Sequence, residues 1–201
     1  MVSVHEAIAR RRMIRSYTSD PIETTVLDEI VASAYSGPSA GNTRSLHVLV
    51  LTRDAVEDYW NITLSADKRS TFPWPGLLIA PVLLIPYVNP SMYIERYSAR
   101  DKARTGLGDG IAAWPVPYWW VDGGAAVENV LLTIAANDLG ACFFGQFEHE
   151  EAVRASFGVP NDYRAVGTIS VGHPDVANDR PSASSRRPRR RVAETTHRDR
   201  W

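Results

Sequence analysis

Arginine side chains form a dense cluster near each end of this 201-residue chain. Each cluster spans six residues; the members are Arg10, Arg11, Arg12 and Arg15 at the first, and Arg186, Arg187, Arg189, Arg190 and Arg191 at the second. The formal charge of the whole chain is −1, so these guanidinium groups sit on an otherwise acidic body. A planar guanidinium can donate two parallel hydrogen bonds to phosphate oxygens. The two clusters therefore predict an anionic, phosphate-bearing ligand.

Each feature also has an ordinary explanation when it is taken alone. The first cluster could be the solvated face of a helix, because runs of charge are usually exposed. The second could belong to a disordered tail that binds nucleic acid or an acidic partner. A Trp-rich segment within residues 101–121 could form a substrate wall or pack against a second subunit.

Several common catalytic motifs are absent from the sequence. It contains no G-x-S-x-G, H-E-x-x-H or Walker A pattern. Its single cysteine, Cys142, excludes an internal disulfide and a cysteine-rich zinc site, and it favours a reducing, cytoplasmic location. The glycines at 106, 108 and 110 lack the spacing of a dinucleotide fingerprint. We therefore expect no metal site and no permanently bound nicotinamide.

Helical and strand patterns alternate along the chain and must position these residues. Apolar spacing and end signals predict helices ahead of Arg12 and at 26–34, 54–64, 75–80, 90–100, 124–139 and 148–157. The end signals include a capping box of Ser3 and Glu6, Asp54 as an N-cap and Gly140 as a helix stop. Strand-forming runs predict strands at 46–52, 82–87, 141–144 and 165–171. The alternation predicts an α/β or α+β fold.

The chain length favours one domain, 1–201, with a sizeable core. No segment approaches the ~20 apolar residues of a membrane span, and no apolar run follows the N-terminus as in a signal peptide. From 173 to 201 the sequence is polar, Pro-rich and basic without periodicity. We interpret this segment as an extended C-terminal arm.

Five motifs in sequence order resemble those of the FMN-dependent nitroreductase-like flavoproteins. They are 11–17 followed by Asp-Pro at 20–21, the turn at 37–44, the central helix and Gly-ended strand within 122–145, the strand end at 171–174, and the basic segment 186–191. The resemblance covers nearly the full chain. It implies a central mixed sheet flanked by helices, and an intertwined homodimer with flavins at the interface.

The resemblance also implies contacts with FMN. Arg15 would lie near the N1–C2=O edge and stabilise the negative charge of the reduced flavin. The phosphate would be held by arginines from both ends of the chain: Arg11, Arg12, Arg187, Arg189 and Arg190. The ring would be contacted by Met13, by Pro38, Ser39, Asn42 and Arg44, and near N5 by Phe144, Gly145 and Gln146. Expected substrate contacts are Trp114, Tyr118 and Trp119.

The implied activity is a two-step, ping-pong reaction. NADPH or NADH would give a hydride to FMN and leave, and a small electron acceptor such as a nitroaromatic or quinone would take its place. The alternatives are a related flavin enzyme of other chemistry (a small-metabolite dehydrogenase, a dehalogenase or a deazaflavin user) and a flavin-sequestering protein without catalysis. We expect neither nucleic acid nor a membrane as partner.

Overall fold

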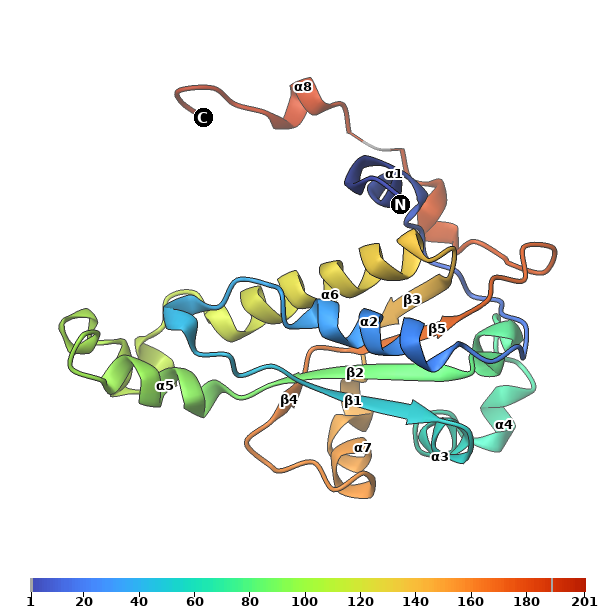
Figure 1. Ribbon diagram of the computed structural model, residues 1–201, viewed down its shortest axis with the longest axis horizontal. Coiled ribbons are helices and arrows are strands. Elements are labelled where there is room, and N and C mark those ends of the chain that lie inside the picture. The colour runs from blue at the N-terminus through green and yellow to red at the C-terminus, as the bar shows by residue number, and fades with distance from the viewer. Residues whose placement is uncertain (1, 189) are drawn as a thin grey trace.

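The structure is a computed structural model that describes residues 2–188 and 190–201 (Figure 1). Its strands form one sheet in the order β1-β2-β5-β3, and the short β4 pairs with β2. The strands are β1 (His47–Thr52), β2 (Val82–Val88), β3 (Gly140–Phe144), β4 (Arg164–Ala165) and β5 (Thr168–Gly172). The α-helices are α1 (Val4–Arg10), α2 (Thr24–Ala34), α3 (Asp54–Thr63), α4 (Ala66–Arg69), α5 (Pro90–Ser98), α6 (Tyr118–Ala136), α7 (Glu150–Ser156) and α8 (Val192–Thr195).

Short 3-10 helices connect several of these elements. They are η1 (Ala40–Asn42), η2 (Pro75–Ile79), η3 (Ala103–Thr105), η4 (Leu107–Asp109), η5 (Ile111–Ala113), η6 (Phe147–His149) and η7 (Ala183–Arg186). The segment after α5, which the sequence leaves as a long connector, is therefore a series of tight turns.

The sheet lies between two layers of helices. Helices α2 and α6 cover one face, and α3 and α7 cover the other (Figure 1). Successive residues of β2 point to opposite faces, so Leu83 and Ile85 join the cluster beneath α3 whereas Leu84 joins the cluster beneath α6. All seven residues of β2 are buried. This two-sided burial explains why β2 reads as a continuous apolar run instead of an alternating one.

The predicted fold class, a sheet flanked by helices, is confirmed. The ladders of β1 with β2, β2 with β5, β3 with β5 and β2 with β4 are all antiparallel. Among the described residues, parallel pairing is limited to the isolated bridge between Met13 and Ala141. That bridge attaches the segment after α1 to the edge of β3.

The central helix has different ends from those predicted. It begins at Tyr118, six residues before the expected start at 124, because Pro117 occupies its N-cap position and leads directly into it. It ends at Ala136, since Asp138 adopts a left-handed conformation with φ of 55°. Gly140 was expected to stop the helix and instead opens β3.

Two further expectations need correction. The strand predicted at 165–171 is divided into β4 and β5, because Gly167 between them has φ of 155° and interrupts the extended run. The residue at the N-cap of α3 is Arg53, and Asp54 lies in the first turn instead of capping it. The capping box of α1 is formed as predicted: the Glu6 backbone N–H donates to Ser3 Oγ, and the Ser3 backbone N–H donates to Glu6 Oε2.

The C-terminal segment is tied to the N-terminal one along its first part. The Thr18 N–H donates to the His173 carbonyl at 3.0 Å, and the Asp175 N–H donates to the Ser16 carbonyl at 2.9 Å. The indole Nε1 of Trp74 donates to the Arg180 carbonyl at 3.1 Å. Beyond η7 the chain runs past α1 and away from the sheet to α8 (Figure 1). Within the described residues, no helix combines the length and apolarity that a membrane span requires.

Candidate functional site

Backbone pairing between the segment after α1 and β3 creates the first part of the candidate site. The Ile14 N–H donates to the Ala141 carbonyl at 2.8 Å, next to the Met13–Ala141 bridge. This pairing brings Arg15 to the end of β3, although the two segments are about 130 residues apart in the sequence. The predicted neighbourhood of Arg15 and the Gly-ended strand therefore exists within one chain.

A cleft of about 420 Å³ opens where β3 ends. Four of its lining residues are predicted cofactor contacts: Arg15, Phe144, Gly145 and Gln146. Aromatic side chains supply much of the remaining wall: Trp60, Phe72, Trp74 and Phe147. Aromatic and apolar walls with few polar groups are typical of sites for planar organic ligands.

Arg15 is held in place at the mouth of this cleft. Its backbone N–H donates to Asp179 Oδ1 at 2.7 Å, and its guanidinium lies 5.6 Å from the ring centroid of Trp74. The guanidinium also donates to the Met13 carbonyl at 3.4 Å. Within the described residues it forms no ion pair with a carboxylate. Its charge is therefore available to a ligand in the cleft.

Gly145 and Gln146 present a peptide group at the other side of the cleft. Gly145 is exposed, and a Cβ built on it would lie 2.9 Å from the ring of Phe147, so a side chain there would require this exposed ring to move. Gln146 is buried, and its Nε2 donates to Thr168 Oγ1 at 3.1 Å. Its side-chain carbonyl has no hydrogen-bond partner within the described residues. The backbone here is open to a ligand while the side chain beneath it is anchored.

The side chain of Met13 is used inside the protein. Its sulfur accepts a hydrogen bond from the Phe143 N–H at 3.3 Å, and the residue packs against both core clusters. If Met13 contacts a cofactor as predicted, the contact is made by its backbone and not by its side chain.

A cavity of about 510 Å³ lies beside Arg10, Arg11 and Arg12. Arg10 pairs with Asp138 at 2.9 Å, and Arg11 pairs with Glu128 at 3.4 Å. Arg12 forms no ion pair within residues 2–188 and 190–201. This cavity suits a small dianion that takes the free charge of Arg12 and competes with Glu128 for Arg11.

The arginines of the second cluster that the structure describes do not line that cavity. The C-terminal arm reaches it through Pro174 and Val176, whereas Arg187 and Arg190 are exposed. Arg189 lies outside the described residues. A phosphate role for these three arginines stays a prediction.

The turn at 38–44 builds a separate pocket of about 490 Å³, lined by Pro38, Ser39, Asn42 and Arg44. The turn is rigid because the Arg44 N–H donates to Ser39 Oγ at 2.9 Å and the Arg44 Nε donates to Asn42 Oδ1 at 2.8 Å. Asn42 and Arg44 both have φ of 55°, a left-handed conformation that Asn tolerates better than Arg.

Asp122 fastens this turn to the body of the protein. Its Oδ2 accepts from the Ala40 N–H and from the Tyr93 hydroxyl, each at 2.7 Å. Burial raises the pKa of Tyr93 to about 12, so its hydroxyl remains a donor at any physiological pH. The hydroxyl of Ser45 also lines the pocket, is buried and has no partner within the described residues.

In one chain most of the predicted cofactor residues line three hollows, which are the Arg15 cleft, the cavity at Arg10–Arg12 and the pocket of the 38–44 turn. The pocket of the 38–44 turn shares no lining residue with the Arg15 cleft or with the cavity at Arg10–Arg12. The turn packs against α5 at one end of the molecule, and α1 lies away from that end (Figure 1). The turn of one chain is therefore not part of the cleft of that same chain.

The predicted substrate contacts differ in exposure. Trp114 and Trp119 are buried around Tyr93, and the Trp114 Nε1 donates to the Leu107 carbonyl at 2.9 Å. Tyr118 is 44% exposed. Of the three, Tyr118 is the one whose side chain a small molecule can reach in this structure.

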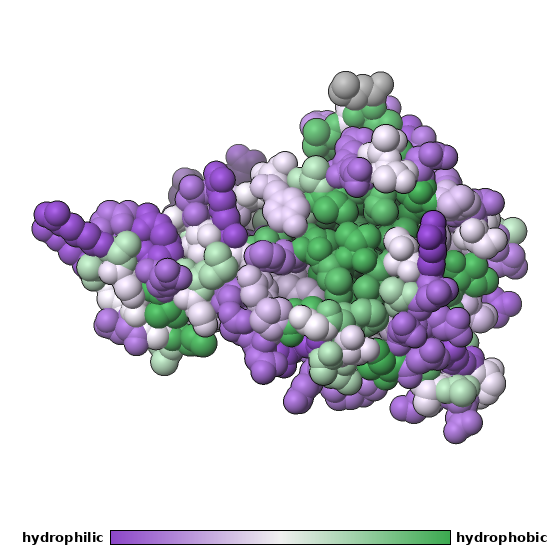
Figure 2. Space-filling view, turned by 60° about the horizontal axis from the view of Figure 1, so that its bottom comes forward, coloured by the Kyte–Doolittle hydropathy of each residue, from purple (hydrophilic) through white to green (hydrophobic). Residues whose placement is uncertain are grey.

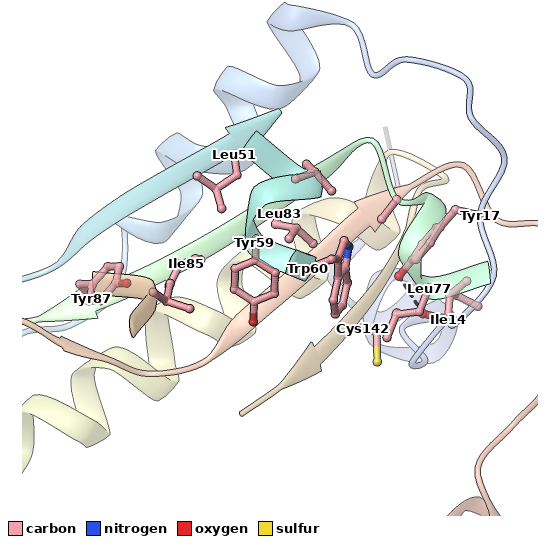
Figure 3. Close-up of a cluster of buried hydrophobic side chains, with 13 residues drawn as sticks. Ile14, Tyr17, Leu51, Tyr59, Trp60, Leu77, Leu83, Ile85, Tyr87 and Cys142 are labelled. Carbon is pink, nitrogen blue, oxygen red and sulfur yellow. Dashed lines mark hydrogen bonds between the residues drawn. The ribbon is translucent and has the colours of Figure 1, made fainter. Parts of the chain in front are cut away.

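The sequence interpretation missed the aromatic wall of the cleft. Tyr59 and Trp60 project side by side from α3 into the cluster that also contains Cys142 (Figure 3). Trp60 stacks on Phe144 with ring centroids 5.8 Å apart. The Phe-Pro-Trp-Pro run at 72–75 was the available signal, because aromatic residues between prolines cannot belong to a regular helix. Burial raises the pKa of the Cys142 thiol, which makes it a poor nucleophile.

Comparison with known proteins gives one consistent set of relatives. The model of the nitroreductase family matches residues 8–173. The chain is 25% identical over 199 residues to a protein of Archaeoglobus fulgidus provisionally named NADH dehydrogenase/NAD(P)H nitroreductase, covering 96% of both chains. It is 27% identical over 185 residues to an NADH dehydrogenase of Thermus thermophilus, covering 84% of this chain and 85% of that one.

Solved structures share the same fold. The nitroreductase CinD of Lactococcus lactis, in complex with 4-nitrophenol, superimposes with a TM-score of 0.73 at 17% identity and covers 94% of this chain and 100% of its own. A protein of Desulfovibrio desulfuricans solved in complex with FMN gives a TM-score of 0.68 at 22% identity, over 100% of this chain and 99% of that one.

Proposed function

Because this chain belongs to the nitroreductase family, we propose that it is an FMN-dependent oxidoreductase that takes electrons from NADH or NADPH and passes them to a small nitroaromatic, quinone or similar acceptor. The observation that carries the proposal is the meeting of Arg15 with the Gly145–Gln146 peptide in one aromatic cleft. The relatives named for NAD(P)H oxidation support the electron donor. A cytoplasmic location stays a prediction that rests on the single free cysteine.

The residues present fit FMN in both charge and shape. The phosphate is a dianion. Within the part of the chain that the structure describes, Arg12 has no ion pair and the ion pair of Arg11 with Glu128 is long, at 3.4 Å. The ring system is flat and aromatic, and the cleft at the end of β3 has aromatic walls and an exposed glycine backbone. Bound there, FMN would supply two-electron redox chemistry between the nicotinamide and the acceptor.

The chain itself supplies binding, orientation and charge. Arg15, fixed through Asp179 and Trp74, places a positive charge where negative charge gathers on the ring edge. Arg11 and Arg12 hold the phosphate. Trp60 and Phe144 exclude water from one side of the cleft. No protein nucleophile is required for this chemistry.

We further propose that the active form is a homodimer in which two chains complete each site. The 38–44 turn does not line the cleft of its own chain, and in the dimer it would serve the cleft of the partner. Hydrophobic side chains gather in one broad area of the surface, bordered by hydrophilic residues (Figure 2). An exposed apolar area of this kind marks a contact with another molecule.

The first test is the visible absorbance spectrum of the purified protein after incubation with FMN, desalting and anaerobic addition of NADH or NADPH. We expect a retained oxidised-flavin spectrum that bleaches with one of the two donors. Retained flavin that neither donor bleaches would favour a flavin-sequestering protein or another donor. Absence of retained flavin would overturn the cofactor assignment. The arginine clusters would then be interpreted as a nucleic-acid site, which salt-dependent DNA retention would test.

The second test uses mixed dimers purified with two different affinity tags. One chain carries Arg15→Ala, which damages the cleft, and the other carries Asn42→Ala, which damages the turn. If each site combines the cleft of one chain with the turn of the other, one site of the mixed dimer is doubly damaged and the other is intact. We therefore expect about half of the wild-type activity, well above that of either parent dimer. If each site lies within one chain, every site carries one defect and activity is not restored.

A further inference from the structure

A chain of buried hydroxyl and amide groups lies directly beneath the cleft, in a part of the core that is otherwise apolar. Thr168 Oγ1 lies 2.9 Å from the hydroxyl of Tyr59 and accepts from Gln146 Nε2 at 3.1 Å. Thr168 has no exposed surface, Tyr59 is 1% exposed and Gln146 is 5% exposed. Buried polar groups stabilise a core only when they have hydrogen-bond partners, and an apolar core would pack as well. These groups are therefore candidates for a functional role.

The chain of groups ends at the peptide that faces the ligand. Thr168 is the first residue of β5 and pairs with Phe144, the last residue of β3. The next two residues, Gly145 and Gln146, lie in opposite environments, since Gly145 is exposed in the cleft and Gln146 is buried. Gln146 is thus the anchor that turns the Gly145–Gln146 peptide toward the cleft, and Thr168 holds the anchor.

The local packing leaves this anchor little freedom. A Cβ at Gly167, just before Thr168, would lie 2.5 Å from the ring of Phe143 and 2.8 Å from the Phe144 carbonyl oxygen. The side-chain carbonyl of Gln146 and the hydroxyl of Tyr87 have no partner within the described residues. Burial raises the pKa of Tyr59 and of Tyr87 to about 12, so both hydroxyls keep their protons. These groups therefore stay uncharged, and they influence the site by holding neighbouring atoms in place and not by transferring protons.

We propose that Thr168 is a positioning residue for the redox reaction: through Gln146, and backed by Tyr59, it fixes the peptide group that contacts the reactive part of the flavin. This inference rests on the proposed function. A fixed peptide dipole at that point alters the energy of the reduced relative to the oxidised flavin, because it stabilises one charge distribution more than the other. The residue therefore acts on the flavin's midpoint potential more than on FMN affinity.

The test compares Thr168→Val, which keeps the shape and removes the hydroxyl, with Thr168→Ser, which keeps the hydroxyl. Ser170→Ala is the matched control, because Ser170 is also buried on β5 but its hydroxyl lies 2.9 Å from that of Tyr17. For each protein we would measure the FMN dissociation constant, the midpoint potential of the bound flavin against a reference dye, and the anaerobic rate of reduction by the donor.

We expect Thr168→Val to shift the midpoint potential and to slow reduction by about five- to ten-fold, the effect of one lost hydrogen bond. FMN affinity should change by less than about three-fold, Thr168→Ser should restore the potential, and Ser170→Ala should leave it unchanged. If Thr168→Val does not fold, Tyr59→Phe removes the other hydroxyl and should shift the potential in the same direction by a smaller amount.

Two outcomes would overturn the inference. A wild-type potential and rate in Thr168→Val would remove any positioning role. Equal shifts in Thr168→Val and Ser170→Ala would show a general loss of packing. Both outcomes leave the proposed function intact, since that fails only if the wild-type protein does not retain reducible FMN.

Discussion

Replacing both Arg11 and Arg12 by alanine is expected to weaken FMN binding by about 10²- to 10⁴-fold. Each charge-assisted hydrogen bond to phosphate contributes about 1.5–3 kcal/mol, so the loss of two amounts to about 3–6 kcal/mol. The Arg12 guanidinium can interact fully with the phosphate, because it forms no ion pair within the described residues. The ion pair of Arg11 with Glu128 is long, at 3.4 Å, so phosphate can replace it. The measurement is the quenching of flavin fluorescence as protein is titrated into FMN.

Riboflavin and Arg10 provide the controls for this prediction. Riboflavin has the same ring but no phosphate, so the double variant should bind it nearly as well as the wild type does. Arg10→Ala removes a guanidinium from the same cluster, but one that already pairs with Asp138 at 2.9 Å on the surface. Its effect on FMN affinity should stay below about three-fold, in line with exposed ion pairs. An equal loss for riboflavin, or for Arg10→Ala, would contradict the phosphate assignment.

The sequence could predict which residues gather in the cleft but not what encloses them. The motif containing Arg15 and the strand ending at Gly145 are each visible in sequence, whereas their backbone pairing at Ile14 and Ala141 is known only from the structure. The aromatic wall was missed because Trp60 lies on an amphipathic helix, where spacing alone indicates burial and not which cavity the ring will line. Trp74 belongs to an irregular segment whose position is decided entirely by tertiary packing.

The Trp-rich segment is less exposed than its composition indicates. The sequence leaves open a substrate wall or a subunit contact, and the structure buries Trp114 and Trp119 around Tyr93. The signal that could have corrected this was Pro117, because proline is common at the start of helices and α6 begins directly after it. A helix starting there carries Trp119 inward and leaves Tyr118 exposed.

The separation of the 38–44 turn from the Arg15 cleft could not be predicted from motif order. Residues 38–44 and Arg15 are close in sequence and belong to one functional set by resemblance, but α2 separates them and places the turn beside α5. A sequence motif can indicate that residues bind the same ligand, but it does not show whether those residues come from one chain or from two. That question is what the mixed-dimer experiment answers.

Replacing Arg15 by alanine is expected to slow reduction of the bound flavin by about 10²- to 10³-fold, while FMN affinity falls far less than in the Arg11, Arg12 double variant. The magnitude is that of removing one preorganised donor from a site where charge develops during the reaction. Arg15 meets this condition because its guanidinium lies over Trp74 and its backbone is fixed to Asp179. The measurement is the anaerobic reduction rate by stopped flow, with FMN kept saturating.

Arg15→Lys separates the charge of this residue from its orientation. Lysine keeps the positive charge, so the midpoint potential of the flavin should remain near that of the wild type. It lacks the planar group that packs on Trp74 and donates in fixed directions, so the reduction rate should recover only in part. Trp74→Leu, which keeps Arg15 but removes its platform, should reproduce that intermediate rate. If lysine instead restores the full rate, charge alone is sufficient and Trp74 is only a wall of the cleft. If neither potential nor rate responds to Arg15→Ala, the positive charge in the cleft has no part in flavin reduction.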